Sequence, residues 1–395
     1  MRSKNYSWQY SLTVTLLLLS PFDLLASLGM DMYLPVVPFM ADILGTGTGV
    51  IQLTLTVYMI LLGMGQLLFG PLSDRFGRRP VLLGGGITYT IASFILSVTS
   101  SADIFLIFRI IQACGASACL VATFATIRDI YSGREESIFI YGLLSSVLVM
   151  VPAVGPLLGV LVDSWLGWRA IFAVLGCIMT IAVIVAWRFW TETRQQQVMD
   201  IQWSQLLLPI KRWNFWLYML CYSAGMGSFF VFFSTAPGLM INQQGLSQLN
   251  FSLLFATVAI AMMVTSRFIG GLINRWGSLS MLRGGMYCLI AGALLLVVGE
   301  IWVPESIFGF IIPMWLIGAG IAIAVSVAPN EALRGLDNVA GTATAVYFCL
   351  GGLLLSGGGT LAIAFFSGDT VWPIIVYCLT FATAVVCLSR FSSVH

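Results

Sequence analysis

The chain has 395 residues, of which 59% are hydrophobic and only 9% are charged, and its formal net charge is +2. A soluble domain carries roughly 25% charged residues, so this chain has too few polar side chains to cover a globule in water. Composition therefore excludes an ordinary soluble protein, and the charge excludes a basic surface for nucleic acid. We expect much of the surface to face membrane lipid.

Residue types needed for several kinds of chemistry are missing. The only histidine is His395, which excludes histidine-based metal sites and Ser-His-Asp catalysis. No GxxxxGK[ST] loop occurs, so ATP hydrolysis by that route is excluded. The expected energy source is an ion gradient or the substrate's own gradient. We expect neither an enzyme nor a metal or cofactor. The cysteines form no CxxC pair, and burial as small hydrophobes is expected for all eight: Cys114, Cys119, Cys177, Cys221, Cys288, Cys349, Cys378 and Cys387.

Apolar windows of about 20 residues, the length that crosses a bilayer, recur along the chain. The first six are Ser11–Val37, Ile51–Gly70, Pro80–Ser100, Ile104–Ile127, Ile138–Val162 and Trp168–Trp187. A polar stretch from Arg188 to Trp213 separates them from Phe215–Met240, Phe251–Leu272, Met281–Gly299, Ser306–Val327, Val339–Phe366 and Thr370–Ser389. No cleavage pattern follows the first window, so we expect a retained span rather than a signal peptide. We predict an all-α membrane protein with twelve transmembrane helices.

Lysine and arginine residues predict the orientation of these helices. When the loops are assigned alternately to two sets, one set holds 15 of these residues, beginning with Arg2 and Lys4. The opposite set holds only Arg169, while Arg109 and Arg267 fall within spans. Because positively charged loops stay in the cytoplasm, both termini are expected there.

A sequence pattern repeats at an offset of 200 residues. Gly70-Pro-Leu-Ser-Asp-Arg-Phe-Gly77 follows the second window, and Gly270-Gly-Leu-Ile-Asn-Arg-Trp-Gly277 follows the eighth. We predict two pseudo-symmetric six-helix halves, residues 1–187 and 214–395, joined by a cytoplasmic linker over 188–213. Such halves around a central cavity are typical of transporters, whose substrate site lies near the midplane.

Charged side chains inside spans are the first candidates for function, because a carboxylate in hydrocarbon costs several kcal/mol. Asp23 and Asp31 lie in the first window, where eight residues of helix rise about 12 Å, so both can face one cavity at different depths. Arg109 in the fourth window is closer in depth to Asp31 and is followed by Gln112. We predict that Asp23, Asp31 and Arg109 couple proton movement to substrate movement.

Structural alternatives exist for each of these residues. Asp23 could lie in the first turn of a helix that starts after Pro21. Asp31 could be a solvated carboxylate near the outer end of its span. Arg109 could extend to the outer interface while its aliphatic part stays in lipid.

The segment Gly70–Pro80 predicts a short cytoplasmic turn. Glycines permit a tight turn, and Asp74 can accept hydrogen bonds from a helix N-terminus or an arginine. We expect a charged latch that holds the two halves together and opens when they move, with a solvated, positively charged turn as the alternative. The residues expected to act in this conformational change are Gly70, Asp74, Arg75, Gly77, Arg78 and Arg79.

The fifth window is rich in proline and glycine. Proline removes a backbone donor and glycine removes side-chain bulk, so this helix can kink or pack closely. Two interpretations therefore stand side by side: a mobile, kinked helix, and a helix that is only tightly packed. The residues concerned are Gly142, Pro152, Gly155, Pro156 and Gly159.

Aromatic and methionine side chains suit lipophilic ligands, and an apolar pocket is expected from some of them. Lipid-facing or core positions are the alternative for each. The candidates are Tyr58, Met59, Phe229, Phe230, Phe232 and Phe233.

These motifs resemble those of a known family. Gly70–Pro80 resembles the cytoplasmic signature of the major facilitator superfamily, and Arg109–Gly115 resembles its fourth-helix motif. Gly142 through Gly159 resembles the fifth-helix motif of its drug exporters, with Val151 in place of one expected glycine. Three further segments look similar to chloramphenicol exporters of the CmlA type in the Bcr/CmlA subfamily: Ser20–Pro35, Gly225–Ser234 and Trp372–Tyr377.

The resemblance implies export of chloramphenicol across the bacterial inner membrane in exchange for protons, and hence antibiotic resistance. It implies that Asp23, Asp31 and Arg109 couple proton and drug, with Asp31 as the acid that contacts the drug. We expect the protein to be a monomer. The drug-contacting residues are then expected to be Asp31, Arg109, Gln112, Tyr58, Met59, Phe229 and Phe233. The alternatives are an exporter of florfenicol or many drugs, a sugar carrier, a membrane receptor or channel, and a membrane enzyme.

Overall fold

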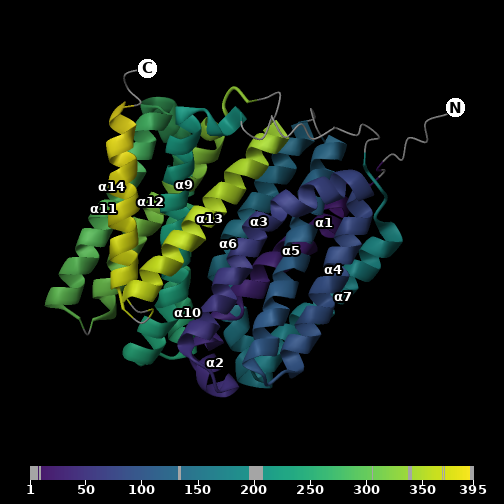
Figure 1. Cartoon of the computed structure of the whole chain (residues 1–395), viewed down its shortest axis with the longest axis horizontal. Coiled ribbons are helices and arrows are strands. Elements are labelled where there is room, and N and C mark those ends of the chain that lie inside the picture. Colours follow the sequence, from purple (N-terminus) through teal and green to yellow (C-terminus); the bar gives the residue numbers. More distant parts are fainter. Residues whose placement is uncertain are drawn as a thin grey trace. The chain divides into compact units, whose positions relative to one another are not determined.

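A computed structural model describes residues 8, 10–131, 135–194, 208–304, 306–336, 340–366, 368 and 370–391. These residues are almost entirely helical, and no strand occurs among them. The chain divides into two compact units, Met1–Asp200 and Ile201–His395, called unit 1 and unit 2 below. In Figure 1, unit 1 runs from purple to blue-teal and unit 2 from teal to yellow.

Over most of its length, each of the twelve predicted windows coincides with one of the helices in the described part of the chain. In unit 1 these are α1 (Leu12–Asp31), followed by a short 3₁₀ turn and α2 (Val37–Leu44), then α3 (Thr48–Phe76), α4 (Arg78–Val98), α5 (Ala102–Tyr131), α6 (Glu135–Leu166) and α7 (Trp168–Phe189). In unit 2 they are α9 (Trp213–Pro237), a π-helical turn over Gly238–Gln243, α10 (Gln248–Trp276), α11 (Ser278–Trp302), α12 (Ile307–Leu333), α13 (Ala340–Phe366) and α14 (Trp372–Phe391).

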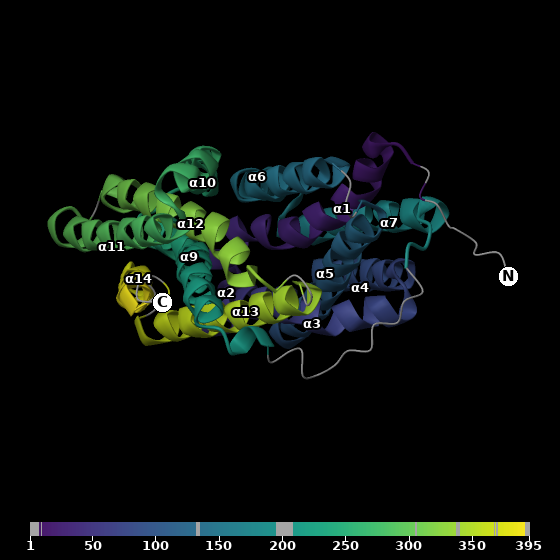
Figure 2. The same ribbon diagram turned by 90° about the horizontal axis from the view of Figure 1, so that it is seen from above.

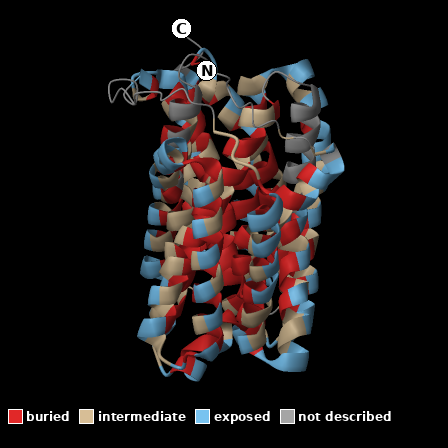
Figure 3. Ribbon diagram, turned by 90° about the vertical axis from the view of Figure 1, so that its right-hand side faces the viewer, coloured by how far each residue is buried: buried red, intermediate tan, exposed pale blue. Residues whose placement is uncertain are grey.

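Eleven apolar helices in the described part of the chain are long enough to cross a membrane, and α6 contains the shorter apolar segment Met150–Leu166. These lengths confirm the predicted all-α membrane protein. Figure 3 shows exposed and intermediate residues on the outer sides of the helices and buried residues behind them.

Capping residues determine where several of these helices begin and end. Ser11 and Ser247 precede α1 and α10 and accept hydrogen bonds from the backbone N–H groups three residues later. Gly77 and Gly277 follow α3 and α10 with φ of +106° and +79°, a conformation that favours glycine. The alternative in which a helix starts after Pro21 is wrong, because α1 begins at Leu12 and contains this proline.

The structure corrects the extent of the turn expected over Gly70–Pro80. α3 continues through Pro71 to Phe76, and Gly77 alone separates it from α4, which begins at Arg78. Pro80 is tolerated because it occupies the first turn of α4, where its missing N–H would have no partner within the helix.

The two units repeat the same local structure. α3 and α10 have 29 residues each and lie 200 residues apart. A Cβ added to Gly85 would lie 2.9 Å from the carbonyl oxygen of Gly115, and one added to Gly285 would lie 3.3 Å from that of Gly320. Glycines at matching positions therefore bring α4 close to α5 and α11 close to α12.

Within unit 1, the functional candidates lie where α1 contacts its neighbours. α1 packs against α5, α6 and α7, and α5 also packs against α3 and α4. Figure 2 shows α1 and α7 on one side of α5, and α3 and α4 on the other.

Candidate functional site

Arg109 of α5 is fully buried inside unit 1. Its Nη1 donates hydrogen bonds to the carbonyl oxygen of Gly29 in α1 at 2.8 Å and to Oε1 of Gln112 at 2.7 Å. Carbonyl oxygens and aromatic ring faces stabilise a cation without a carboxylate. Arg109 Cζ lies over three rings, at 4.4 Å from the ring centre of Tyr58, 5.0 Å from that of Tyr33 and 5.8 Å from that of Phe172.

Gln112 links Arg109 to α4. Its Nε2 donates to Oγ of Ser93 at 2.8 Å, and Oγ of Ser93 donates to the carbonyl oxygen of Tyr89 at 2.8 Å. Both ends of the Gln112 amide are therefore used, which orients Oε1 toward Arg109. The structure brings Gln112 and Arg109 together as their spacing of three on a helix predicts.

Two tyrosines hold α1 beside Arg109. The hydroxyl groups of Tyr58 and Tyr89 donate to the carbonyl oxygens of Ala26 and Leu25 at 2.7 and 2.8 Å. A Cβ on Gly29 would lie only 2.7 Å from the Tyr58 hydroxyl and 2.6 Å from that of Tyr89, so a larger residue here would displace both hydroxyl groups. We call Arg109, Tyr58 and Tyr89 the α1 clamp, because all three donate to main-chain oxygens of α1.

The α1 clamp also revises the expected place of Tyr58, since its ring packs on a guanidinium and its hydroxyl binds α1. The sequence did not predict Tyr89, Tyr33 and Ser93, because they carry no charge and their contacts depend on how the helices pack. A tyrosine inside an apolar window was the available sequence signal for Tyr58 and Tyr89.

Neither predicted carboxylate pairs with Arg109. Asp23 is 0% exposed, and both of its carboxyl oxygens lack a hydrogen-bond partner among the described residues. Asp31 is the last residue of α1 and is 6% exposed. The ion pairs found in the described part of the chain involve neither residue. The acids and the cation thus belong to one bundle but are separate in this arrangement.

Asp31 lies against the glycines of α6. A Cβ on Gly155 would collide with Cβ of Asp31, and one on Gly159 would collide with the carbonyl oxygen of Met32. These glycines therefore let α6 approach the end of α1 closely, as the tight-packing interpretation predicts. Pro152 and Pro156 lie within α6, as does Gly142, and movement of this helix stays a prediction.

Gly159→Ala is expected to lower the free energy of unfolding by roughly 1–3 kcal/mol. The reason is that the new methyl group meets backbone atoms, which cannot move aside as a flexible side chain can. Thermal unfolding of purified protein measures the effect. The matched control is Gly49→Ala in α3, where an added Cβ meets nothing within 4 Å. Equal melting temperatures for the two variants would contradict the close contact between α6 and α1.

The charged residues at the junction of α3 and α4 form a network. Arg78 donates from Nη1 to Asp74 at 2.5 Å and to Oγ of Ser73 at 3.2 Å, and from Nε to Asp129 at 2.7 Å. The backbone N–H groups of Arg78 and Arg79 donate to the carboxylate of Glu192 at 2.8 and 3.1 Å. A carboxylate at a helix N-terminus is favourable there.

This charged network lies entirely within unit 1, joining α3, α4 and α5 to the segment after α7. Asp129 and Glu192 were not predicted, and their only sequence signal is an acidic residue near the end of a window or in the polar stretch. Arg75 and Gly70 take no part in the hydrogen bonds of the network. The φ of +106° at Gly77 favours glycine, and an added Cβ would also displace the Glu192 carboxylate. The expected action of this network on the two halves stays a prediction.

The remaining predicted drug contacts are Met59 in unit 1 and Phe229 and Phe233 in unit 2. Met59 is partly buried in α3. Phe229 and Phe233 of α9 lie 6.1 Å apart between ring centres, and both contact Phe255 of α10, at 6.5 and 5.9 Å. These rings pack on one another inside unit 2, and their contact with a drug stays a prediction.

Comparison with known proteins gives consistent matches over the whole chain. Residues 22–359 match the family model described as Major Facilitator Superfamily. A chloramphenicol resistance protein of Pseudomonas aeruginosa is 69% identical over 394 residues, covering 100% of this chain and 94% of that protein. Multidrug resistance protein D of Escherichia coli (strain K12) is 28% identical over 356 residues, covering 88% and 87% of the two chains.

Solved transporters share the fold. The D-xylose–proton symporter superposes with a TM-score of 0.74 at 14% identity, covering 96% of this chain and 97% of that one. The nucleoside transporter NupG has a TM-score of 0.71 at 14% identity, covering 96% and 100%. At this identity the likeness concerns the fold alone.

Proposed function

Since this chain belongs to the major facilitator superfamily, we propose that it exports chloramphenicol from the bacterial cytoplasm in exchange for protons. It is a multi-pass membrane transporter and not an enzyme. The observation that carries the choice of drug is the 69% identity, over the full chain, to a chloramphenicol resistance protein. The site of action is then the inner membrane, with both termini in the cytoplasm, as the 15-to-1 distribution of loop lysine and arginine indicates.

The acids of α1 are proposed to carry the proton. A buried ionised carboxylate without a partner is unfavourable by several kcal/mol, so the surroundings of Asp23 suit its protonated form. Chloramphenicol is uncharged, so exchange for a proton requires the protein itself to change protonation when the drug binds. Release of the proton from Asp23 or Asp31 on drug binding meets this requirement.

Arg109 is proposed to respond to that release. While the acids are neutral, its charge is held by carbonyl oxygens and aromatic rings, as in the α1 clamp. Ionisation of a carboxylate on α1 would attract the guanidinium and loosen its bond to Gly29. A shift of α1 relative to α5 would follow. We propose that α6 moves with α1, because Gly155 and Gly159 lie in close contact with the end of α1.

Drug accumulation in bacterial cells tests this function. Cells that express the protein are expected to accumulate less labelled chloramphenicol than cells with an empty vector, and a protonophore is expected to abolish the difference. If expressing cells still accumulate less drug than empty-vector cells when the protonophore is present, proton-driven export is excluded. Equal accumulation with and without the protein would exclude export of this drug altogether.

A broader drug range is the second candidate. It is supported by the match to multidrug resistance protein D over 88% of this chain. The same accumulation assay with florfenicol and unrelated drugs separates the two. Reduced accumulation of chloramphenicol alone supports a narrow exporter, whereas reduced accumulation of several unrelated drugs supports a multidrug one.

A further inference from the structure

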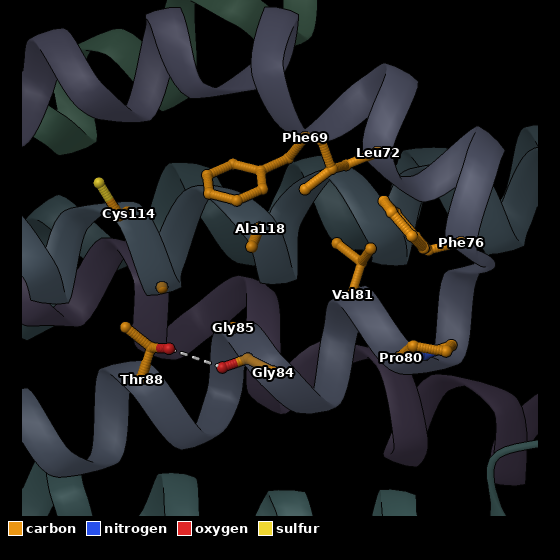
Figure 4. A pocket seen from close by; sticks show the side chains of 11 residues that line it. Phe69, Leu72, Phe76, Pro80, Val81, Gly84, Gly85, Thr88, Cys114 and Ala118 are labelled. Atoms are coloured by element: carbon orange, nitrogen blue, oxygen red, sulfur yellow. Dashed lines mark hydrogen bonds between the residues drawn. The ribbon is translucent and has the colours of Figure 1, made fainter.

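An apolar groove lies in unit 1, and none of the three α1 clamp residues lines it. It has a volume of about 330 Å³ and runs between α3 and α4, with α5 as its floor. Figure 4 shows Phe69, Leu72 and Phe76 of α3 on one side, Val81 of α4 on the other and Ala118 of α5 beneath them. The remaining lining residues are Pro80, Gly84, Gly85, Thr88, Cys114 and Gly115.

The groove is open at the surface of unit 1. Phe76 is 59% exposed and Leu72 is 43% exposed, although both are large apolar side chains. A Cβ added to Gly84 would meet nothing within 4 Å, so this part of the α4 wall is open. In a membrane protein an apolar groove of this kind is filled by hydrocarbon rather than by water.

A cation lies at one end of the groove. Cζ of Arg75 is 5.5 Å from the ring centre of Phe76, and the Arg75 side chain is exposed. Within the described residues Arg75 forms no ion pair, whereas its neighbour Arg78 is paired with Asp74 and Asp129. The charge of Arg78 is therefore largely compensated, and Arg75 remains available to an anion beside the apolar groove.

We propose that the groove binds one acyl chain of an anionic phospholipid whose phosphate is held by Arg75. The planar guanidinium matches the geometry of a phosphate, and basic residues at the cytoplasmic end of spanning helices attract anionic headgroups. The combination of hydrocarbon-filled groove and unpaired arginine selects a lipid over a free phosphate ion, which could not use the groove. This inference does not depend on which drug is transported.

Lipid binding to purified protein tests the proposal. Delipidated protein is titrated with phosphatidylglycerol or with phosphatidylcholine of the same acyl chains, and bound lipid is counted by native mass spectrometry. The wild type is expected to bind phosphatidylglycerol more tightly. Arg75→Gln is expected to reduce this affinity about fivefold, to the level of phosphatidylcholine, because one headgroup contact is lost.

The groove itself is tested by filling it. Gly84→Leu places a side chain in open space, so the variant should fold, and it is expected to reduce the affinity for both lipids at least about tenfold. The matched control is Gly284→Leu, 200 residues later in α11, where an added Cβ also meets nothing within 4 Å. This control should bind both lipids as the wild type does.

Three outcomes would overturn the proposal. The first is unchanged lipid binding by both Arg75→Gln and Gly84→Leu. The second is loss of bound phosphatidylglycerol on addition of inorganic phosphate alone, which would indicate a simple anion site. The third is that chloramphenicol displaces the lipid from the wild type and that, among the three variants, only Gly84→Leu loses drug binding. This result would show that the drug occupies the groove.

Discussion

Arg109→Met is expected to abolish chloramphenicol export while the protein remains in the membrane at its normal level. Methionine fills much of the same buried space, but it cannot donate to Gly29 or Gln112 or interact as a cation with the three rings. Each hydrogen bond from the charged group contributes about 1.5–3 kcal/mol to the stability of the folded arrangement, and this contribution is lost in the variant. Resistance of expressing cells and drug efflux are the measurements, normalised to the protein present in the membrane.

The control for this substitution is Arg267→Met. Arg267 also lies within a span, in α10 of unit 2, but it is exposed. This variant is expected to export the drug at about the wild-type rate. Normal export by Arg109→Met would show that the guanidinium has no role in transport and that Arg109 only fills space.

Asp23→Asn is expected to remove proton coupling without unfolding the protein. Asparagine has nearly the shape of a protonated aspartate, and the buried position of Asp23 offers neither oxygen a partner in the described part of the chain. The amide cannot release a proton when the drug enters. Addition of chloramphenicol to weakly buffered purified protein should therefore acidify the solution for the wild type but not for the variant, and resistance should be lost.

Asp42→Asn is the control for this experiment, because Asp42 is an exposed carboxylate in α2 of the same unit. It should retain both proton release and resistance. Persistent proton release by Asp23→Asn, together with its loss in Asp31→Asn, would transfer the coupling role to Asp31. Persistent release in both single variants and in the double variant would remove the α1 acids from the mechanism.

These two tests are independent because Asp23 and the Arg109 cation have no hydrogen-bond partner in common among the described residues of unit 1. Arg109 has its own set of partners, and Asp23 is buried elsewhere along α1. In this arrangement, a substitution at one residue therefore does not remove a hydrogen-bond partner of the other. In the proposed mechanism, coupling between them passes through α1, whose main-chain oxygens accept hydrogen bonds from Tyr58 and Tyr89.

Part of the site could be predicted from the sequence because it depends on local spacing. Arg109 and Gln112 lie three residues apart on one helix, so their contact follows from helix geometry alone. The donors from Tyr58 and Tyr89 could not be predicted in the same way, because they depend on how α3 and α4 are aligned along α1. The same holds for Glu192, which reaches the start of α4 from a position 114 residues further along the chain than Arg78.

The length of the turn over Gly70–Pro80 was overestimated for a related reason. Proline and glycine at Gly70 and Pro71 usually indicate the end of a helix, yet α3 continues past both to Phe76. The residue that ends it is Gly77, whose positive φ reverses the chain and whose N–H bonds to the carbonyl oxygen of Ser73 at 3.0 Å. Local propensity is a weak guide where neighbouring helices support the backbone.

The sequence by itself determined the membrane-spanning helices and the repeat of the chain. These properties depend on the length of each apolar window and on glycines at fixed positions, which are features of single segments. Tertiary structure alone decided which polar side chains meet. It placed Arg109 on aromatic rings and a carbonyl oxygen instead of on Asp31, and it placed Asp31 against the glycines of α6. The physical reason is that such contacts depend on the axial alignment and rotation of adjacent helices, which are set by close packing between segments distant in the chain.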